Sequence, residues 1–369
     1  MAWPPTTTDI LDVVEGGVYH RSDRYSFELL DADWTVIGEL VADPGASPAL
    51  SIDTSRTIIR TLDNLNLPVH VVNDINPVSD LVRPVMHLQN GARFHLGVLG
   101  WAQDNRPRRS WGIEHASSLR DGMFFLSQVR GRTSSTRKGQ NLLQRAIDHA
   151  LLRIRPDRIR VEGASGGAAG APMVWGPNDP LTDIINDHLA PIGFLPVFFD
   201  HEGYLVFRPA PEDISQTPPD VTYRPGGRIL ADSIVGSDDL LDAPNVYVVM
   251  ETSGQGTPIS GRYQLPASAP HSVENRNGEE VVKVITMQGL ESKAQADAAA
   301  KRAAQTDESA YEWEQFAGVA DPRHDTHTVV ETVLPGLDGD LVGNTHLEVS
   351  HRMVLTSGGP HTHVVRRVY

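Results

Sequence analysis

The stretch SFELLDADWTVIGEL, residues 26–40, contains two runs of alternating apolar and polar residues, 26–31 and 34–40. Ala32-Asp33 separates the runs, which predicts a β-hairpin with a short polar turn. Further strand-like runs follow at 57–62, 81–88, 92–102 and 122–130. Six short strands at this spacing predict a small antiparallel barrel that is closed or nearly closed.

Two local signals refine this first β-unit. Pro84 lies inside the run 81–88, and a proline cannot donate to a ladder, so we expect it at a sheet edge or a bulge. Asn90-Gly91 follows that run and is typical of a hairpin turn.

The middle of the chain changes to a helical period. One apolar stripe predicts a helix within 133–152, and it consists of Leu142, Leu143, Ala146, Ile147, Ala150 and Leu151. A strand at 158–161 leads into GASGGAAGAP, residues 163–172, which we expect to be a flexible loop. Asn178-Asp179-Pro180 predicts the start of a second helix that ends at Gly193. The expected buried face of this helix is Leu181, Ile184, Ile185, His188 and Leu189. A hairpin over 194–200 and 204–209 follows, and the Pro-rich segment 209–220 predicts a linker.

Alternating patterns return in the last third. The predicted strands are 245–253, 260–265, 279–286, 311–319, 327–334, 345–357 and 361–369. Ser292 and Gln295 form a capping box before an Ala-rich run, which predicts a helix over 291–310. We therefore predict an α+β protein that is mainly β: a first barrel domain at 1–132, an α+β domain at 133–225, and a second barrel domain at 226–369 with one flanking helix.

Bulk composition excludes several classes of protein. The chain has 369 residues, 40% of them hydrophobic, so it is long enough for two or three domains with real cores. It contains no cysteine, which excludes disulfides, thiol catalysis and Cys-ligated zinc. We expect no signal peptide and no membrane-spanning segment. The net charge of −15 argues against broad binding to nucleic-acid phosphates.

The charge is unevenly distributed. Residues 104–160 hold thirteen Lys/Arg and five acids, a net +8, so the remainder carries −23. The basic residues are Arg106, Arg108, Arg109, Arg120, Arg130, Arg132, Arg137, Lys138, Arg145, Arg153, Arg155, Arg158 and Arg160. A solvated basic face explains this strip, as does complementarity between the basic strip of one subunit and the acidic remainder of another. A nucleic-acid groove is the third interpretation, and it has few interleaved aromatic residues to support it.

Two sets of residues are candidates for chemistry. The run Gly163-Ala164-Ser165-Gly166-Gly167 matches a nucleophile pattern with Ser165 as its serine, and His188 or His201 as a possible base. Gly170 and Pro172 follow, so no helix can begin there to support an elbow, and a surface loop is the favoured interpretation.

His361 and His363 are two residues apart on a predicted strand, so both rings point to one face and could chelate a metal, for example on a threefold axis. Other histidines lie nearby in sequence at His324, His327, His346 and His351. The favoured interpretation is an exposed polar edge strand without a metal. We therefore assign no catalytic, cofactor-binding or metal-binding residues.

The order of elements resembles that of a known family. The runs SFELLDADWTVIGEL, RTIIRTLDNLNLP and RPVMHLQNGARFHLGVLGW resemble the start of minor tail proteins of long-tailed phages of actinobacteria. GFLPVFFDHEGYLVFRP and DDLLDAPNVYVVM look similar to the same group. This is the tail-tip or baseplate hub class, with two tail-tube-like barrels per chain.

The resemblance implies a structural virion protein without catalytic residues or cofactors. It implies a homotrimer whose six barrels form a ring, joining a hexameric tail tube to threefold tip components. Implied partners are the distal tail and tail tube proteins, other minor tail proteins and fibres, and the tape measure protein and genomic DNA that pass through the lumen without specific binding. The implied location is the tail tip of the virion, after synthesis in the host cytoplasm. An acidic lumen would repel the phosphates of DNA and let it pass without sticking. The alternatives are a serine hydrolase using Ser165 and a receptor- or carbohydrate-binding β-module.

Overall fold

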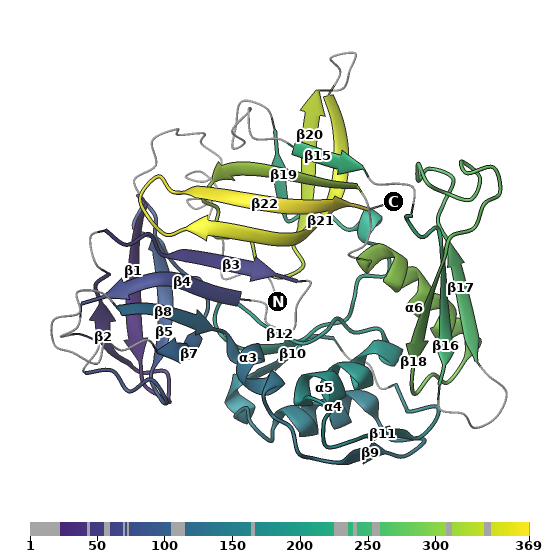
Figure 1. Ribbon diagram of the computed structural model, residues 1–369, viewed down its shortest axis with the longest axis horizontal. Helices are drawn as coiled ribbons and strands as arrows, with labels where there is room; N and C mark the ends of the chain where they lie inside the picture. Colours follow the sequence, from purple (N-terminus) through teal and green to yellow (C-terminus); the bar gives the residue numbers. More distant parts are fainter. Residues whose placement is uncertain are drawn as a thin grey trace.

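The computed structural model describes residues 23–42, 45–54, 60–68, 71, 74–104, 115–163, 167–224, 235–238, 242–252, 259–307, 312–335 and 341–368. Strands dominate over a few short helices, so the predicted α+β, mainly β class is confirmed (Figure 1). Within these ranges, no helix has both the length and the apolar character needed to cross a bilayer.

The first third is built almost wholly of strands. They are β1 (Arg24–Leu30), β2 (Val36–Leu40), β3 (Ala49–Asp53), β4 (Arg60–Leu67), β5 (Leu81–His87), β6 (Arg93–His95), β7 (Leu99–Asp104) and β8 (His115–Arg120). The predicted hairpin is β1–β2, with Phe27 opposite Leu40. Pro84 lies in β5 between the residues that pair with β7 and those that pair with β6, so its missing N–H falls at a gap in the ladder.

The middle third contains the helices α3 (Gly122–Ser127), α4 (Leu142–Ala150) and α5 (Leu181–Leu189), and the short 3-10 turns η1 (Pro156–Arg158), η2 (Ala190–Ile192) and η3 (Ile214–Gln216). Its strands are β9 (Ser134–Thr136), β10 (Ile159–Val161), β11 (Met173–Trp175), β12 (Phe198–Phe199), β13 (Leu205–Phe207) and β14 (Val221–Tyr223). The predicted buried face of α5 is confirmed in full, and Gly193 follows η2 with a left-handed φ of 77°.

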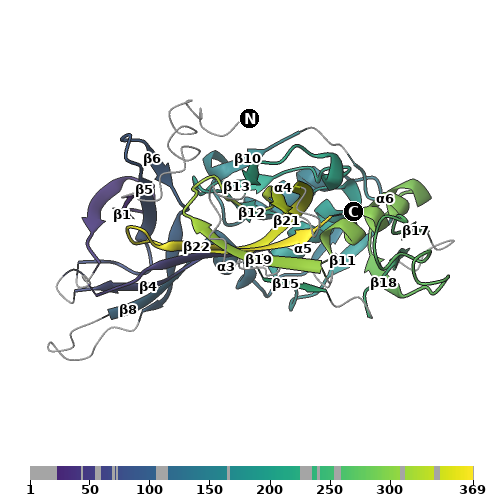
Figure 2. The ribbon, with the colours of Figure 1, turned by 90° about the horizontal axis from the view of Figure 1, so that it is seen from above.

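The last third contains two sheets. Its strands are β15 (Val235–Asp238), β16 (Val246–Glu251), β17 (Ser260–Gln264), β18 (Val282–Met287), β19 (Glu312–Val319), β20 (Val329–Pro335), β21 (Leu341–Val354) and β22 (Pro360–Arg367). Helix α6 (Lys293–Thr306) packs on the small sheet β17-β16-β18, at the opposite end of the molecule from β1 (Figures 1 and 2). Ser292 caps α6 by accepting from the backbone N–H of Gln295, as predicted.

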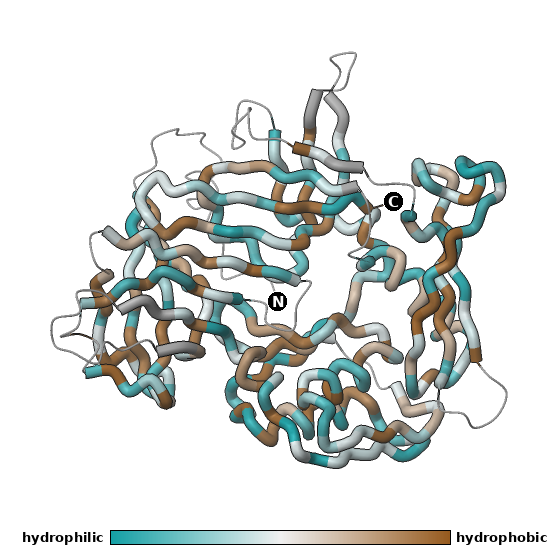
Figure 3. The backbone as a smooth tube through the Cα atoms, viewed as in Figure 1, coloured by the Kyte–Doolittle hydropathy of each residue, from teal (hydrophilic) through white to brown (hydrophobic). Residues whose placement is uncertain are grey.

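The first and last thirds share one sheet. Its path is β15-β19-β22-β21-β3-β4-β8-β7-β5-β1-β2, with β14, β20 and β6 attached, fourteen strands in total. β3 pairs antiparallel with β21, so that Leu50 faces Met353. Hydropathy changes repeatedly along these strands, as alternation requires (Figure 3). Closure of the two barrels stays a prediction.

The hydrophobic core follows the shared sheet. Met353 and Leu355 from the last third are buried among Leu50, Leu62 and Trp101 from the first. The middle helices form a second core with Phe199 and Phe207, and α6 forms a third core with the small sheet. The first core is therefore completed only by residues from both ends of the chain.

Two predictions for the first β-unit are wrong. The run 122–130 forms helix α3 and not a strand, because the Asp121 side chain caps it by accepting from the Met123 backbone N–H. The run 92–102 is divided between β6 and β7. Strands β3 and β8 were not predicted, since ALSID and HASSLR carry few apolar residues.

The expected flexible loop 163–172 is also wrong for its described part. Ala169 is buried, and the Gly170 backbone N–H donates to the Gly289 carbonyl. A Cβ at Gly170 would lie 2.1 Å from the Leu290 carbonyl oxygen, so glycine permits this close backbone contact with the last third. The expected linker 209–220 is packed too, with Ile214 buried and Asp213 paired to Lys301 of α6.

Candidate functional site

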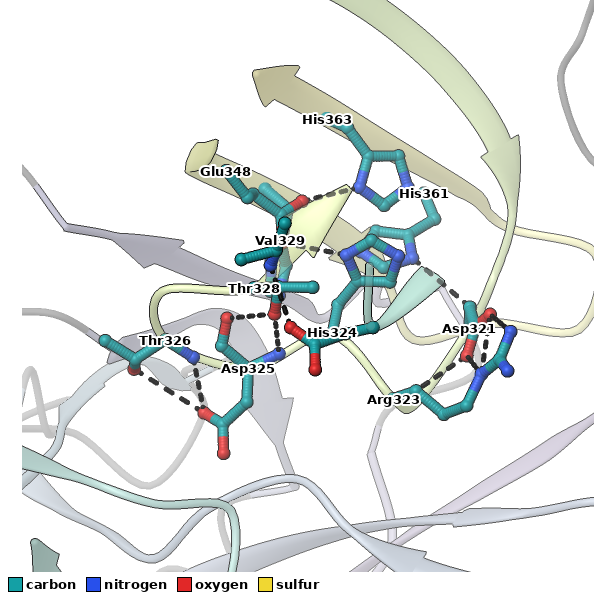
Figure 4. Close-up of polar contacts among 12 residues, drawn as sticks. Asp321, Arg323, His324, Asp325, Thr326, Thr328, Val329, Glu348, His361 and His363 are labelled. Atoms are coloured by element: carbon teal, nitrogen blue, oxygen red, sulfur yellow. Dashed lines mark hydrogen bonds and ion pairs between the residues drawn. The ribbon is translucent and has the colours of Figure 1, made fainter. Parts of the chain in front are cut away.

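The segment that joins β19 to β20, residues 320–328, lies where the three thirds of the chain meet. It is buried along most of its length and carries two adjacent polar residues with different partners (Figure 4). Asp325 contacts the first and middle thirds, and His324 enters a cluster of histidines beneath the sheet. We treat these two groups as the candidate functional site.

Arg60 and Asp325 form the first group, a buried joint. The Arg60 guanidinium, with a side chain 2% exposed, donates to Asp325 at 2.5 Å. It also donates to the carbonyl oxygens of Phe199 and Asp200, at 3.3 and 2.8 Å. One side chain of β4 therefore bonds to the middle hairpin and to the last third simultaneously.

His201 completes the joint from the middle third. Its backbone N–H donates to Asp325 at 3.2 Å, and its Nδ1 lies 3.1 Å from the same carboxylate. Burial raises the pKa of Asp325, but the charge of Arg60 and the His201 hydrogen bond outweigh it and hold that pKa well below its ordinary value. Burial lowers the pKa of His201, and Asp325 outweighs it and raises that pKa. Arg60 and His201 thus favour the ionised form of the Asp325 carboxyl.

Glu348 on β21 forms the centre of the second group, the histidine cluster. One carboxylate oxygen lies 2.7 Å from Nδ1 of His324 and 3.2 Å from Nδ1 of His351, and the other lies 2.7 Å from Nδ1 of His363. The rings of His361 and His363 are 3.9 Å apart between centroids. All five side chains are buried.

Tyr223 of β14 bridges two members of the histidine cluster. Its hydroxyl lies 2.7 Å from Nε2 of His324 and 3.2 Å from Nε2 of His363. Phe316 stacks on the His363 ring and covers it from β19. Nδ1 of His361 accepts from the Asp321 backbone N–H at 3.2 Å, which places the proton of the neutral ring on Nε2.

Burial and the charge of Glu348 shift the pKa values of these histidines in opposite directions. Burial lowers the pKa of His324, but the charge of Glu348 outweighs it and raises that pKa. Burial lowers the pKa of His363 to about 4 and that of His361 well below its ordinary value. Burial raises the pKa of Glu348, and the His324 charge outweighs it and lowers that pKa well below the ordinary value. Glu348 is therefore a carboxylate that only one of these three histidines can neutralise.

The structure corrects the sequence interpretation of His361 and His363. They do lie on one face of a strand, but β22 is an interior strand between β19 and β21, and both rings are fully buried. The expected exposed edge strand is therefore wrong. His324 and His351 join them, while His346 on β21 lies apart and bonds to Thr332 at 2.8 Å. Sequence reasoning missed Glu348, Tyr223 and the joint, because they come from distant segments.

The other candidates do not gather into a site. Ser165 lies outside the described residues. His188 is buried against Trp175 and bonds to Thr136 at 2.7 Å, which is a structural arrangement. His201 belongs to the joint with Asp325.

The basic strip is used partly within the chain. Arg155 pairs with Asp33 and Arg158 lies 3.7 Å over the Trp34 ring, so these two arginines attach the middle third to the first, whereas Arg160 pairs with Asp200 at 2.6 Å within the middle third. Four of the basic residues are exposed, and their side chains form neither an ion pair nor a hydrogen bond with another described residue: Arg132, Arg137, Lys138 and Arg153. These four, called the exposed basic group below, remain available to a partner.

Solved structures of other proteins share this arrangement of strands and helices. No family model matches the chain, and no curated protein matches it. Three solved structures share its architecture over almost the whole length of both chains. The tail protein from Neisseria meningitidis is 13% identical, with a TM-score of 0.65 over 93% of this chain and 96% of its own. The 43 kDa tail protein of prophage MuSo2 from Shewanella oneidensis is 12% identical, with a TM-score of 0.60 over 94% and 98%. Prophage tail protein gp18 from Listeria monocytogenes is 11% identical, with a TM-score of 0.56 over 92% and 94%. The resemblance seen in the sequence is thus confirmed at the level of the fold: this chain has the fold of phage tail proteins.

Proposed function

We propose that the protein is a structural hub of a phage tail tip, assembled as a homotrimeric ring around the DNA channel. The observation that carries this proposal is the likeness to three phage tail proteins across at least 92% of this chain and 94% of theirs. A match of this extent includes both β-units and the middle helices together. The proposal includes no enzymatic activity.

The way the thirds are attached supports a structural role. The shared sheet, the Arg60–Asp325 joint and the Arg158–Trp34 contact connect all three parts through buried or half-buried contacts. A ring subunit must keep its two β-units in a fixed relation, because the unit-to-unit geometry sets the geometry of the ring. Buried polar contacts with specific partners provide such a fixed geometry.

Charge supports assembly between copies. The exposed basic group lies on the middle third, and the remainder of the chain outside 104–160 carries −23. Opposite charges across an interface select the orientation of the partner and reject wrong pairings. We propose that the exposed basic group of one subunit faces an acidic surface of the next, and that acidic residues line the channel.

Mass measurement in solution tests the trimer, and labelling of the virion tests the location. A trimer has three times the chain mass of 40.3 kDa. Charge reversal of Lys138 to Glu, together with Arg137 to Glu, should weaken the trimer, whereas reversal of Lys293, exposed on α6 in an i,i+4 pair with Asp297, should not. An antibody against the chain should bind intact phage at the tail tip. Labelling elsewhere on the particle, or none, contradicts the proposal.

A further inference from the structure

We propose that His324, His351 and Glu348 bind one divalent transition-metal ion of the Zn²⁺ type within a single chain. One ligand atom from each of these residues lies within 4.8 Å of the other two. The carboxylate oxygen of Glu348 is 2.7 Å from Nδ1 of His324 and 3.2 Å from Nδ1 of His351. Ligands at about 2.0–2.1 Å from a tetrahedral ion are roughly 3.3 Å apart, so a small widening of the group would accommodate it.

The donor set matches the chemistry of such an ion. Two imidazoles and one carboxylate are the protein ligands of open zinc sites, in which a fourth position is left to water. Imidazole nitrogen favours zinc and its neighbours over calcium or magnesium, which prefer oxygen ligands. The chain contains no cysteine, so histidine is the side chain through which it would bind an ion of this type.

A strand bulge brings the ligands to one face. Glu348 and His351 are three residues apart, and in a regular strand they would point to opposite faces. The register of β21 against β22 shifts between Glu348 and Ser350, so that Glu348 pairs with Val365 and His351 with His363. Such bulges re-aim side chains. His324 then reaches the same face from the segment between β19 and β20 (Figure 4).

The surrounding hydrogen bonds are complete when Nδ1 of His324 carries an ion, as they also are when His324 is protonated on both nitrogens. With an ion on Nδ1, Nε2–H of His324 donates to the Tyr223 hydroxyl. That hydroxyl donates to Nε2 of His363, and Nδ1–H of His363 donates to the second oxygen of Glu348. Outer partners of this kind orient metal-binding histidines and carboxylates. If His324 were neutral, metal-free and protonated on Nδ1, Nε2 of both His324 and His363 would be unprotonated. The one Tyr223 hydroxyl proton could then serve only one of these two acceptors.

Two buried nitrogens next to the proposed ion form no well-aligned hydrogen bond among the described residues, although one of them lies 3.2 Å from the Glu348 carboxylate. They are Nδ1 of His351 and Nε2 of His361. The ion would coordinate the first. The second carries a proton, and its ring lies 4.9 Å from that of His351, so it can donate to a water on the fourth position of the ion. One ion with its water would thus satisfy both nitrogens.

The experiment uses the full-length protein stripped with a chelator and then titrated with Zn²⁺ or Co²⁺. We expect one ion per chain by calorimetry, a higher melting temperature, and the visible absorption of tetrahedral Co²⁺. His351→Gln should weaken binding by more than about 100-fold. The matched control His346→Gln changes a buried histidine of the same strand outside the cluster and should bind as the wild type does.

Two results would overturn the inference. One is a folded, stripped wild-type protein that takes up no ion at one equivalent, and the other is a folded His351→Gln that binds as tightly as the wild type. X-ray absorption of the wild-type Zn²⁺ complex decides the matter if the variant does not fold. Two imidazoles and one carboxylate support the site, and any other ligand set refutes it. Neither result depends on the proposed role in a phage tail.

Discussion

Replacement of Asp325 by Asn tests whether the buried joint holds the three parts of the chain together. The variant keeps the shape of the side chain and removes its charge, leaving Arg60 with a side chain only 2% exposed and no carboxylate beside it. Breaking a buried ion pair by removing one partner costs about 3–5 kcal/mol. Because the Asp325 side chain is 16% exposed and some water can reach it, we expect the lower end, about 3 kcal/mol.

The assay is urea unfolding of the wild type, Asp325→Asn and the control Asp33→Asn. Asp33 makes an exposed ion pair with Arg155, so the control should unfold like the wild type. Asp325 raises the pKa of His201, so the His201 contribution is complete below its ordinary pKa and is lost as the pH rises through the raised value. The destabilisation should therefore be larger at about pH 6 than at about pH 9. A loss below about 1 kcal/mol, or one equal to that of the control, refutes the reasoning.

Three further changes test other parts of the structure. Burial lowers the pKa of His346 to about 4, so the neutral ring stabilises the fold fully above the ordinary value of 6.5, and this contribution is lost as the pH falls. Between about pH 7.5 and about pH 5.5, the free energy of unfolding of the wild type should therefore fall by roughly 1.4 kcal/mol more than that of His346→Gln. The same pH profile for both proteins would contradict this. Gly261→Ala places a Cβ 2.1 Å from the backbone of α6 and should cost about 1–3 kcal/mol in urea unfolding, whereas Gly38→Ala, with nothing within 4 Å, should change little. Ser292→Ala removes the cap of α6 and should lower the unfolding free energy by about 1 kcal/mol; equal stability would show that the cap contributes nothing.

Local patterns predicted most of the elements that carry a clear period. The helical stripe of α4, the proline-marked start of α5 and the alternating runs of β19 to β22 all form where the sequence indicates. Helix α3 was mistaken for a strand, because its paired phenylalanines favour strands while the cap from Asp121 decides for a helix. Polar β8 carries too few apolar residues to show a period.

Long-range features could not be predicted from these patterns. Nothing in ALSID indicates that β3 pairs with β21, since strand patterns specify a face and not a partner. The sequence predicted only part of the histidine cluster: His361 and His363 share a face because side chains alternate along a strand. Glu348 and His351 required a bulge that reverses that alternation, and Tyr223 comes from a strand more than one hundred residues away in sequence.

The pairing of β3 with β21 has a consequence for the order in which the chain folds. Thr54, at the end of β3, bonds to Val349 across 295 residues of sequence. During synthesis, β3 therefore lacks its β21 partner along one edge until β21 has left the ribosome. Such distant closure slows folding and exposes intermediates to misassembly. The same closure acts as a check on completeness, because a subunit truncated before β21 lacks the residues that finish its first core.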